Sequence, residues 1–336
     1  MYRNAQLSAV LASYLPSQIF VLADSQLSVD FPYPTMRIEA IETNKTIVSA
    51  AQIWRFLASH NASRQAVLVN IGGGTICDLG GFAAATYMRG IDYVNVPTTL
   101  LAMVDAAIGG KTAVNLECDG SQQMLLKNYV GAFRQPKAVI TDISFLQTLP
   151  AEEWLSGYGE VLKTSLLTAS GAFAEVIESI EQSAAVEQHL RCSNVIEMCR
   201  DYKESIVAQD PEESGLRKVL NFGHTVGHAL EEKTGAKHGY CVVWGMVAEL
   251  YLSVVLCSCP RDILTQMSHI MLTNYGRPQC NCKQQSELVA LMRKDKKNAS
   301  AESIIFTLLR NAGDPIINQV ADESLINEAL DYLFSL

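Results

Sequence analysis

The sequence predicts an α/β domain with a mostly parallel sheet, followed by an all-α domain, in a chain of 336 residues. Up to Pro150, short apolar runs of strand character alternate with helical patterns, which is typical of a parallel sheet with helices on both faces. Beyond Pro150 helical periodicity dominates, and 304–309 is the main strand-like exception. Because a chain of this length usually forms about two domains, we expect them to span 1–150 and 151–336.

Each expected element follows from a local pattern. The run 66–71 is apolar, rich in β-branched residues and followed by three glycines, as expected of a buried strand. Apolar residues at helical spacing predict a helix over 46–60. The other elements of the first domain are expected to be strands at 18–22, 36–41, 93–96 and 137–141 and helices at 75–88 and 100–109. The helices of the second domain are expected at 151–168, 172–182, 186–208, 222–234, 240–257, 261–275, 284–294 and 322–335.

Composition excludes several classes of protein. The net charge is −9 and the longest basic run is KDKK, so nucleic acid is not an expected partner. We find neither a signal peptide nor an apolar run of about 18 residues, so no membrane association is expected. The nine cysteines have no zinc-ribbon spacing and are expected to be reduced thiols, which favours a cytoplasmic location.

Three histidines lie close together in the stretch 220–239. His224 and His228 are four residues apart and would share one face of a helix, for which Asn221 is a suitable N-cap. His238 follows a turn at Gly235, where a loop would fold it back onto that face. A single histidine of this kind is more often a core or surface residue, but three together favour a site for Zn²⁺ or a similar cation.

A carboxylate in a second apolar helix is the best candidate for a further ligand. Glu160 and Lys163 lie three residues apart in a largely apolar helical stretch. The simpler alternative is a surface ion pair, worth only about 0.3–0.5 kcal/mol. A carboxylate surrounded by apolar residues needs a partner, however, and one Glu with two His would leave coordination positions open, as in catalytic metal sites.

The glycines Gly72, Gly73 and Gly74 stand between an expected strand and an expected helix. Such a turn lets the backbone approach a pyrophosphate, although Cys77 breaks the G-x-G-x-x-G pattern and a plain tight turn is the alternative. The hydroxyl residues Thr98 and Thr99 follow the next strand. Two such turns at successive strand ends favour a nucleotide site. Asp78 is then either a ribose ligand or a cap.

Several cationic residues could bind an anionic substrate, although each alone is more often solvated surface. The stretch around Lys111 lacks the spacing of a P-loop. Arg217 and Asn221 are the better candidates, because they are four residues apart and directly precede His224. The other candidates are Arg89, Lys203, Lys296 and Lys297.

The ordered motifs together resemble the 3-dehydroquinate synthases, a family of sugar-phosphate cyclases. The resemblance rests on IGGGTICDLGGFAAATYMRG, VPTTLLAMVDAAIGGKTAVN, KNYVGAF, FLQTLP, GYGEVLK, GLRKVLNFGHTVGHALE and HGYCVVWGM, and it extends from about Asp24 to about Asn298. It implies a Rossmann-like domain that binds NAD, followed by a helical domain that binds metal and substrate. The metal would be Zn²⁺ or Co²⁺.

The resemblance also assigns residues. The implied metal ligands are Glu160, His224 and His238, whereas His228 lies beside the site and takes part in proton transfer. The implied NAD contacts are Asp24, Glu42, Lys45, Gly73, Gly74, Asp78, Thr98, Thr99, Asp105, Lys127, Phe145 and Thr148. The implied substrate contacts are Arg89, Lys111, Asn128, Lys163, Lys203, Arg217, Asn221, His228 and Lys296, and those with a catalytic role are His228, Lys163, Lys111, Asn221 and Arg217.

Two further features follow from the resemblance. The Arg89 equivalent reaches the neighbouring subunit's site in the family, which implies a homodimer. The connection 117–126 is longer than the family's usual one, and Leu126 stands where the family tends to have glycine. We expect a bulging loop there, next to Lys127 and Asn128.

The implied reaction converts 3-deoxy-arabino-heptulosonate 7-phosphate to 3-dehydroquinate and phosphate in the shikimate pathway. It combines transient NAD-dependent oxidation, β-elimination of phosphate, reduction and intramolecular aldol closure. The alternatives are another cyclase, such as a 2-deoxy-scyllo-inosose synthase, a metal-dependent polyol dehydrogenase, or a catalytically silent NAD-binding protein. The set of polar residues from Asp105 to Lys296 argues against a silent NAD-binding protein, because unpaired buried charge is costly without a function.

Overall fold

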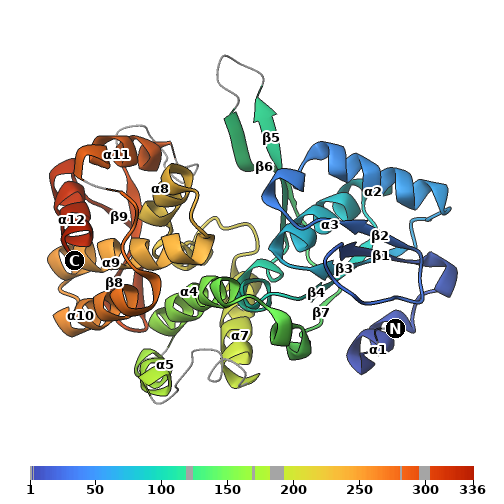
Figure 1. Ribbon diagram of the computed structural model, residues 1–336, viewed down its shortest axis with the longest axis horizontal. Helices are drawn as coiled ribbons and strands as arrows, with labels where there is room; N and C mark the ends of the chain where they lie inside the picture. The colour runs from blue at the N-terminus through green and yellow to red at the C-terminus, as the bar shows by residue number, and fades with distance from the viewer. Residues whose placement is uncertain are drawn as a thin grey trace. The chain divides into compact units, whose positions relative to one another are not determined.

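The computed structural model describes residues 2, 4–118, 124–168, 171–181, 193–280, 282–294 and 303–336. The chain divides into two compact units, Met1–Leu149 and Pro150–Leu336. Figure 1 shows strands concentrated in the first unit and helices in the second.

The first unit is built on a parallel five-stranded sheet with strand order β2-β1-β3-β4-β7. Alternate residues of the central strands point to opposite faces, as the pleat requires. Phe20 and Leu22 pack with α2 and α3, whereas Ile19 and Val21 pack on the other face with α1. The strands are β1 (Ile19–Asp24), β2 (Thr35–Ile38), β3 (Val67–Gly72), β4 (Asp92–Pro97) and β7 (Ala138–Val139), and the α-helices are α1 (Ala5–Leu11), α2 (Ile47–Ser59) and α3 (Gly74–Thr86).

Shorter helical turns connect these elements. The helix expected over 100–109 is a five-residue π-helix, η4 (Ala102–Ala106), and the helix α1 was not expected. The remaining turns of the unit are the 3₁₀ segments η1 (Pro16–Gln18), η2 (Glu42–Asn44), η3 (Tyr87–Arg89) and η5 (Ile143–Thr148).

An antiparallel hairpin, β5 (Lys111–Cys118) with β6 (Met124–Phe133), replaces much of the expected loop 117–126. Leu116 pairs with Leu126 and Cys118 with Met124, and the register shifts between Val114 and Leu116. The additional residues of this connection therefore extend the β5–β6 pairing beyond a β-bulge. Residues 119–123 of the expected loop lie outside the described residues.

The second unit is mainly helical, as expected, but it is not all-α. Two strands, β8 (Ile305–Asn311) and β9 (Asp314–Val320), form an antiparallel hairpin at the position that the sequence marked as an exception. The helices are α4 (Ala151–Leu167), α5 (Ala172–Glu181), α7 (Ser193–Gln209), α8 (His224–Thr234), α9 (His238–Cys257), α10 (Arg261–Ile270), α11 (Gln285–Arg293) and α12 (Glu323–Ser335), with the turns η6 (Leu216–Asn221), η7 (Met271–Tyr275) and η8 (Cys282–Gln284).

Helix α9 is the centre of this unit and packs against α4, α8, α10, α12 and β8. It is long and apolar enough to cross a membrane, with a mean hydropathy of 1.8, although the sequence was expected to contain no such stretch. Because 67% of its apolar stretch is buried inside the unit, α9 is a core helix of this unit.

Candidate functional site

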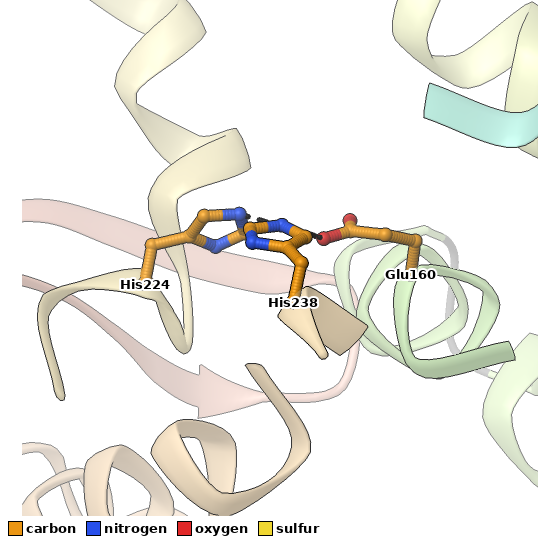
Figure 2. Close-up of side chains that lie close together, drawn as sticks. All are labelled: Glu160, His224 and His238. Atoms are coloured by element: carbon orange, nitrogen blue, oxygen red, sulfur yellow. Dashed lines mark hydrogen bonds and ion pairs between the residues drawn. The ribbon is translucent and has the colours of Figure 1, made fainter. Parts of the chain in front are cut away.

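Three helices of the second unit bring Glu160, His224 and His238 together (Figure 2). Glu160 lies on α4, His224 on α8 and His238 on α9. The Nε2 atoms of His224 and His238 lie 3.4 and 3.2 Å from Glu160 Oε1. One ligand atom from each residue falls within 4.8 Å of the others, which is the spacing that a shared cation requires.

Close helix contacts at glycine explain how α4 and α9 present these side chains to each other. A Cβ atom added to Gly239 would lie 1.8 Å from the Ser156 carbonyl oxygen, and one added to Gly159 would lie 2.4 Å from the Gly239 oxygen. The two backbones therefore touch where no side chain intervenes. Because Glu160 follows Gly159 and His238 precedes Gly239, this contact places the carboxylate beside the imidazole.

Each imidazole is oriented through its other ring nitrogen. His224 Nδ1 lies 3.0 Å from the carbonyl oxygen of Phe222, and His238 Nδ1 lies 2.9 Å from Glu231 Oε2. When a cation is bound, the proton of each ring would sit on Nδ1 and the Nε2 lone pair would be free to coordinate the cation. Outer partners of this kind fix the tautomer and ring orientation of metal-binding histidines.

The electrostatics of the cluster favour a charged Glu160 and an unprotonated His224. Burial alone would raise the pKa of Glu160, but the Lys163 ammonium and the two imidazoles lower it well below its usual range. Burial, with the Lys163 charge, lowers the pKa of His224 to about 3. Burial opposes protonation of His238, but the Glu160 and Glu231 carboxylates raise its pKa to about 10 in the absence of a cation.

The donor set fits a divalent transition metal. One carboxylate and two imidazoles suit Zn²⁺ or Co²⁺ and leave positions for substrate oxygens. His228 lies beside this set, with its ring centroid 5.2 Å from that of His224 and 6.1 Å from that of His238. It is not a member of the ligand group. The proton-transfer role that the resemblance implied for His228 stays a prediction.

Two local expectations around these histidines are wrong. Asn221 does not cap α8: it ends η6, and the N-cap of α8 is Gly223, with a φ of 78°. His238 does not lie in a loop, because it is the first residue of α9. The helix expected to begin at Tyr240 therefore begins at His238.

Expected anion-binding residues lie on α7 and η6 of the same unit. Lys203 and Arg217 are buried. Asn221 donates a hydrogen bond of 2.8 Å to Glu213 Oε1. The amides of Ser214, Gly215 and Arg217 all donate to the Asp210 carboxylate.

Glu213 and Asp210 belong to this network, but sequence reasoning missed both. The acidic stretch DPEESG, which ends two residues before Arg217, was the available signal. Lys296 and Lys297 lie outside the described residues.

In the first unit, the β3–α3 turn has a backbone suited to phosphate. A Cβ atom added to Gly73 would lie 3.1 Å from Thr99 Cγ2, and one added to Gly74 would lie 3.2 Å from Ala106 Cβ. Gly73 is the N-cap of α3 and brings no side chain to cap it, so the first amides of the helix are available to an anion. Thr98 follows β4, and its amide donates to the Gly72 carbonyl.

A second group of expected residues in this unit is joined by hydrogen bonds. Lys45 Nζ donates to Asp78 at 2.5 Å. Asn115 donates to Glu42 Oε1 at 2.8 Å and accepts from the Asn128 amide at 2.8 Å. Asn115, to which sequence reasoning gave no role although it ends the motif VPTTLLAMVDAAIGGKTAVN, therefore links two of the expected contacts.

The remaining expected residues of this unit are more dispersed. Asp24 ends β1 and accepts from the amides of Gln26 and Ala40. Phe145 packs against Tyr2 with ring centroids 5.3 Å apart. Four other residues lie on separate elements: Asp105 on η4, Thr148 at the end of η5, Lys111 at the exposed start of β5 and Lys127 exposed on β6.

Comparison with known proteins identifies the family. The sequence model described as 3-dehydroquinate synthase N-terminal matches residues 35–156, and that described as 3-dehydroquinate synthase C-terminal matches 157–298. The chain belongs to the 3-dehydroquinate synthase family. It is 40% identical over 349 residues to the 3-dehydroquinate synthase of Parabacteroides distasonis, covering 98% of this chain and 95% of the relative. The Corynebacterium jeikeium 3-dehydroquinate synthase is 38% identical over 304 residues, with 88% of this chain and 78% of the relative covered.

Solved structures share the fold at lower identity. The 2-epi-5-epi-valiolone synthase of Streptomyces hygroscopicus, solved with NAD⁺ and Zn²⁺, has a TM-score of 0.80 at 22% identity, covering 98% of this chain and 95% of that one. A 2-deoxy-scyllo-inosose synthase complexed with carbaglucose-6-phosphate, NAD⁺ and Co²⁺ has a TM-score of 0.79 at 21% identity with the same coverage. The fold class, the family and the enzyme class expected from the sequence are thereby confirmed, while the roles of individual residues stay predictions.

Proposed function

We propose that this chain is a 3-dehydroquinate synthase that converts 3-deoxy-arabino-heptulosonate 7-phosphate to 3-dehydroquinate and phosphate. The observation that carries the proposal is the cluster of Glu160, His224 and His238, with Lys163 beside it, in a member of this family. The cluster argues against a catalytically silent NAD-binding protein. A carboxylate, two imidazoles and an ammonium group are costly to bury together, and such a protein would have no function that requires them.

Glu160, His224 and His238 would hold Zn²⁺ or Co²⁺, which as a Lewis acid would make a substrate hydroxyl more acidic. The glycine turn after β3 and the first amides of α3 would hold the pyrophosphate of NAD⁺, which supplies a reversible hydride acceptor. The other expected NAD contacts in the first unit would hold the nucleosides. That solved relatives of this fold carry NAD⁺ with Zn²⁺ or Co²⁺ supports both assignments.

The chain's own residues divide the remaining work. His228 is close enough to both ligand imidazoles to exchange a proton with a substrate hydroxyl at the site. Lys163, held beside Glu160, stabilises developing negative charge on the substrate. Lys203, Arg217 and Asn221 bind its carboxylate or phosphate through charge-assisted hydrogen bonds. The same role is proposed for Arg89, Lys111, Asn128 and Lys296.

We also propose a homodimer in which Arg89 serves the neighbouring subunit. Three consecutive residues, Met88, Arg89 and Gly90, have positive φ angles of 48°, 69° and 115°, and Met88 is 50% exposed. Strained backbone of this kind is typical of functional segments. Tyr129 and Phe133 of β6 are also more than half exposed, which favours a covering partner.

The dimer is tested by mixing two inactive variants, Arg89→Ala and His228→Ala, after measuring the mass of each in solution. Exchanged subunits should regain activity, because one site of each mixed dimer is then intact. A monomeric mass, or no recovery on exchange, would contradict the shared site.

The function is tested by measuring phosphate release from the heptulosonate phosphate with NAD⁺ present in catalytic amount. We expect many turnovers per NAD⁺, no accumulation of NADH, loss of activity on chelation and recovery with Zn²⁺ or Co²⁺. Turnover of glucose 6-phosphate instead would identify a 2-deoxy-scyllo-inosose synthase, and stoichiometric NADH would identify a polyol dehydrogenase.

A cytoplasmic location is part of the proposal. The cysteines whose side chains are described are free thiols, which supports it.

A further inference from the structure

Glu249 is a fully buried carboxylate in the middle of the apolar helix α9. Its exposed fraction is 0%, and it is the only acidic or basic residue besides His238 in the stretch His238–Cys257. Burying a carboxylate is costly unless hydrogen bonds compensate, so its presence in a core helix requires an explanation.

The carboxylate accepts hydrogen bonds from the start of helix α8. The Gly223 amide donates to Oε2 at 2.6 Å, and the amides of Thr225 and Val226 donate to Oε1 at 3.0 and 3.2 Å. These amides belong to the first turn of α8, where a helix leaves its amides without internal partners. The residue that they flank is His224.

This arrangement replaces a cap that α8 cannot supply itself. Gly223 is the N-cap and has no side chain, and its φ of 78° disfavours any other residue. A Cβ atom there would also lie 2.5 Å from Met246 Cγ and 2.9 Å from the Val242 oxygen, both on α9. The usual Ser, Thr, Asp or Asn cap is therefore excluded, and the acceptor must come from another helix.

The sequence of α9 provides both the space and the acceptor on one face. A Cβ atom on Gly245 would lie 2.0 Å from the Gly223 oxygen, so the start of α8 rests directly on α9 at this glycine. Glu249 follows four residues later, one turn along the same face. The contact at Gly245 thus brings the α8 amides within reach of the Glu249 carboxylate.

We propose that Glu249 is a positioning residue for the metal site, holding the turn that carries His224 before a cation binds. The backbone of His224 is fixed by the flanking amides, and its ring is fixed by the Phe222 carbonyl. A turn that is already ordered loses less conformational entropy when the metal binds, so the metal affinity is higher. The inference rests on the proposed metal ligands.

The test compares Glu249→Gln with Ser253→Ala in the full chain. Glutamine has nearly the same volume as glutamate, but its NH₂ group would replace one of the two oxygens that accept from the α8 amides, so one acceptor is lost. Ser253 lies one turn further along α9, where its hydroxyl donates to the Glu249 backbone carbonyl and accepts from the Leu309 amide. Its loss therefore destabilises the same helix without removing an acceptor from the α8 amides. Zn²⁺ affinity is measured by chelator competition well below the melting temperature of each protein, and the visible absorption of bound Co²⁺ reports the ligand geometry.

We expect Glu249→Gln to bind Zn²⁺ about 10–100-fold more weakly, with an altered Co²⁺ spectrum, as happens when outer partners of metal ligands are lost. Ser253→Ala should keep the wild-type affinity and spectrum. Equal affinity of Glu249→Gln and wild type, or equal weakening in both variants, would overturn the inference. Failure of the wild-type chain to bind either ion would overturn the proposed function itself.

Hydrogen exchange of the wild-type protein gives a second test that does not depend on the variant folding. If Glu249 holds the turn in advance, the Gly223, Thr225 and Val226 amides should be protected equally in the metal-free and Zn²⁺-loaded protein. Protection that appears only on Zn²⁺ binding would show that the metal orders the turn, and would overturn the inference.

Discussion

The glycine turn of the first unit and the Glu160–His224–His238 cluster of the second are assembled in different ways. The turn is contiguous in sequence, and Gly72 to Gly74 join β3 directly to α3. The cluster draws one residue from each of three helices, and its geometry depends on backbone contacts at Gly239 and Gly245. A local motif can therefore describe the turn, whereas the cluster exists only where the helices cross.

This difference predicts how substitutions act. A change in the turn should alter the affinity for one ligand and leave the rest of the protein unaffected. A change at a helix crossing should alter both stability and metal binding, because the same contact that packs the helices also places the ligands.

The largest effect is expected within the cluster itself. His224→Ala should weaken metal binding by more than about 100-fold, beyond the loss that an outer hydrogen bond causes. His228→Ala should retain the metal and lower kcat by about 10²–10⁴-fold, as expected for loss of a proton-transfer group. The metal content of each purified variant checks the first expectation, and single-turnover rates check the second. If both variants lost metal equally, His228 would have to be counted as a ligand.

The next effect is expected at the crossing of α4 and α9. Gly239→Ala places a methyl group against the Ser156 oxygen, where the added atom would be 1.8 Å away, so the helices must separate. We expect a loss of about 1–3 kcal/mol in the free energy of unfolding, together with weaker Zn²⁺ binding. Urea unfolding and chelator competition measure these quantities.

Gly235→Ala is the matched control for that substitution. Gly235 has a φ of 68° and no atom within 4 Å of an added Cβ. Its replacement should cost about 1–2 kcal/mol through backbone strain alone. Metal affinity should then fall in Gly239→Ala and not in Gly235→Ala; an equal fall in both would mean that lost stability, not helix spacing, weakens the site.

A smaller and more selective effect is expected in the glycine turn. Gly73→Ala brings a methyl group within 3.1 Å of Thr99 Cγ2 and narrows the approach to the first amides of α3. We expect NAD⁺ binding to weaken about tenfold, equivalent to about 1.4 kcal/mol, with Zn²⁺ binding unchanged. Calorimetric titration with each ligand measures this. Unchanged NAD⁺ affinity would place the pyrophosphate elsewhere.

The smallest effect is a pH dependence of stability at Asp210. The backbone hydrogen bond from Arg217, with those from Gly215 and Ser214, lowers the pKa of Asp210 to about 2, against an ordinary value of 3.8. Because the pKa is lower in the folded state, this stabilisation is present above pH 3.8 and is lost as the pH falls through about 2. Urea unfolding over this range should show a shallower decline in Asp210→Asn than in wild type. Parallel curves would mean that Asp210 has the same pKa in both states.

The accuracy of sequence reasoning varied with how local each feature was. The strand before Gly72 and the helix after it were predicted within one or two residues, because apolar runs and glycines mark them directly. The β5–β6 hairpin was missed because β6 is largely exposed, so it lacks the alternation of a half-buried strand. The start of α9 was misplaced because His238 carries no capping signal and Lys237 precedes it as the N-cap.

By itself, the sequence determined the parallel sheet, the glycine turn, the helical second unit and the family, because periodicity and ordered motifs are properties of neighbouring residues. Only the tertiary structure decided that Glu231 orients His238 and that Glu249 caps the turn carrying His224. Both carboxylates act across a contact between helices. Which side chains meet there depends on how closely the helix backbones approach, and that distance is set by packing.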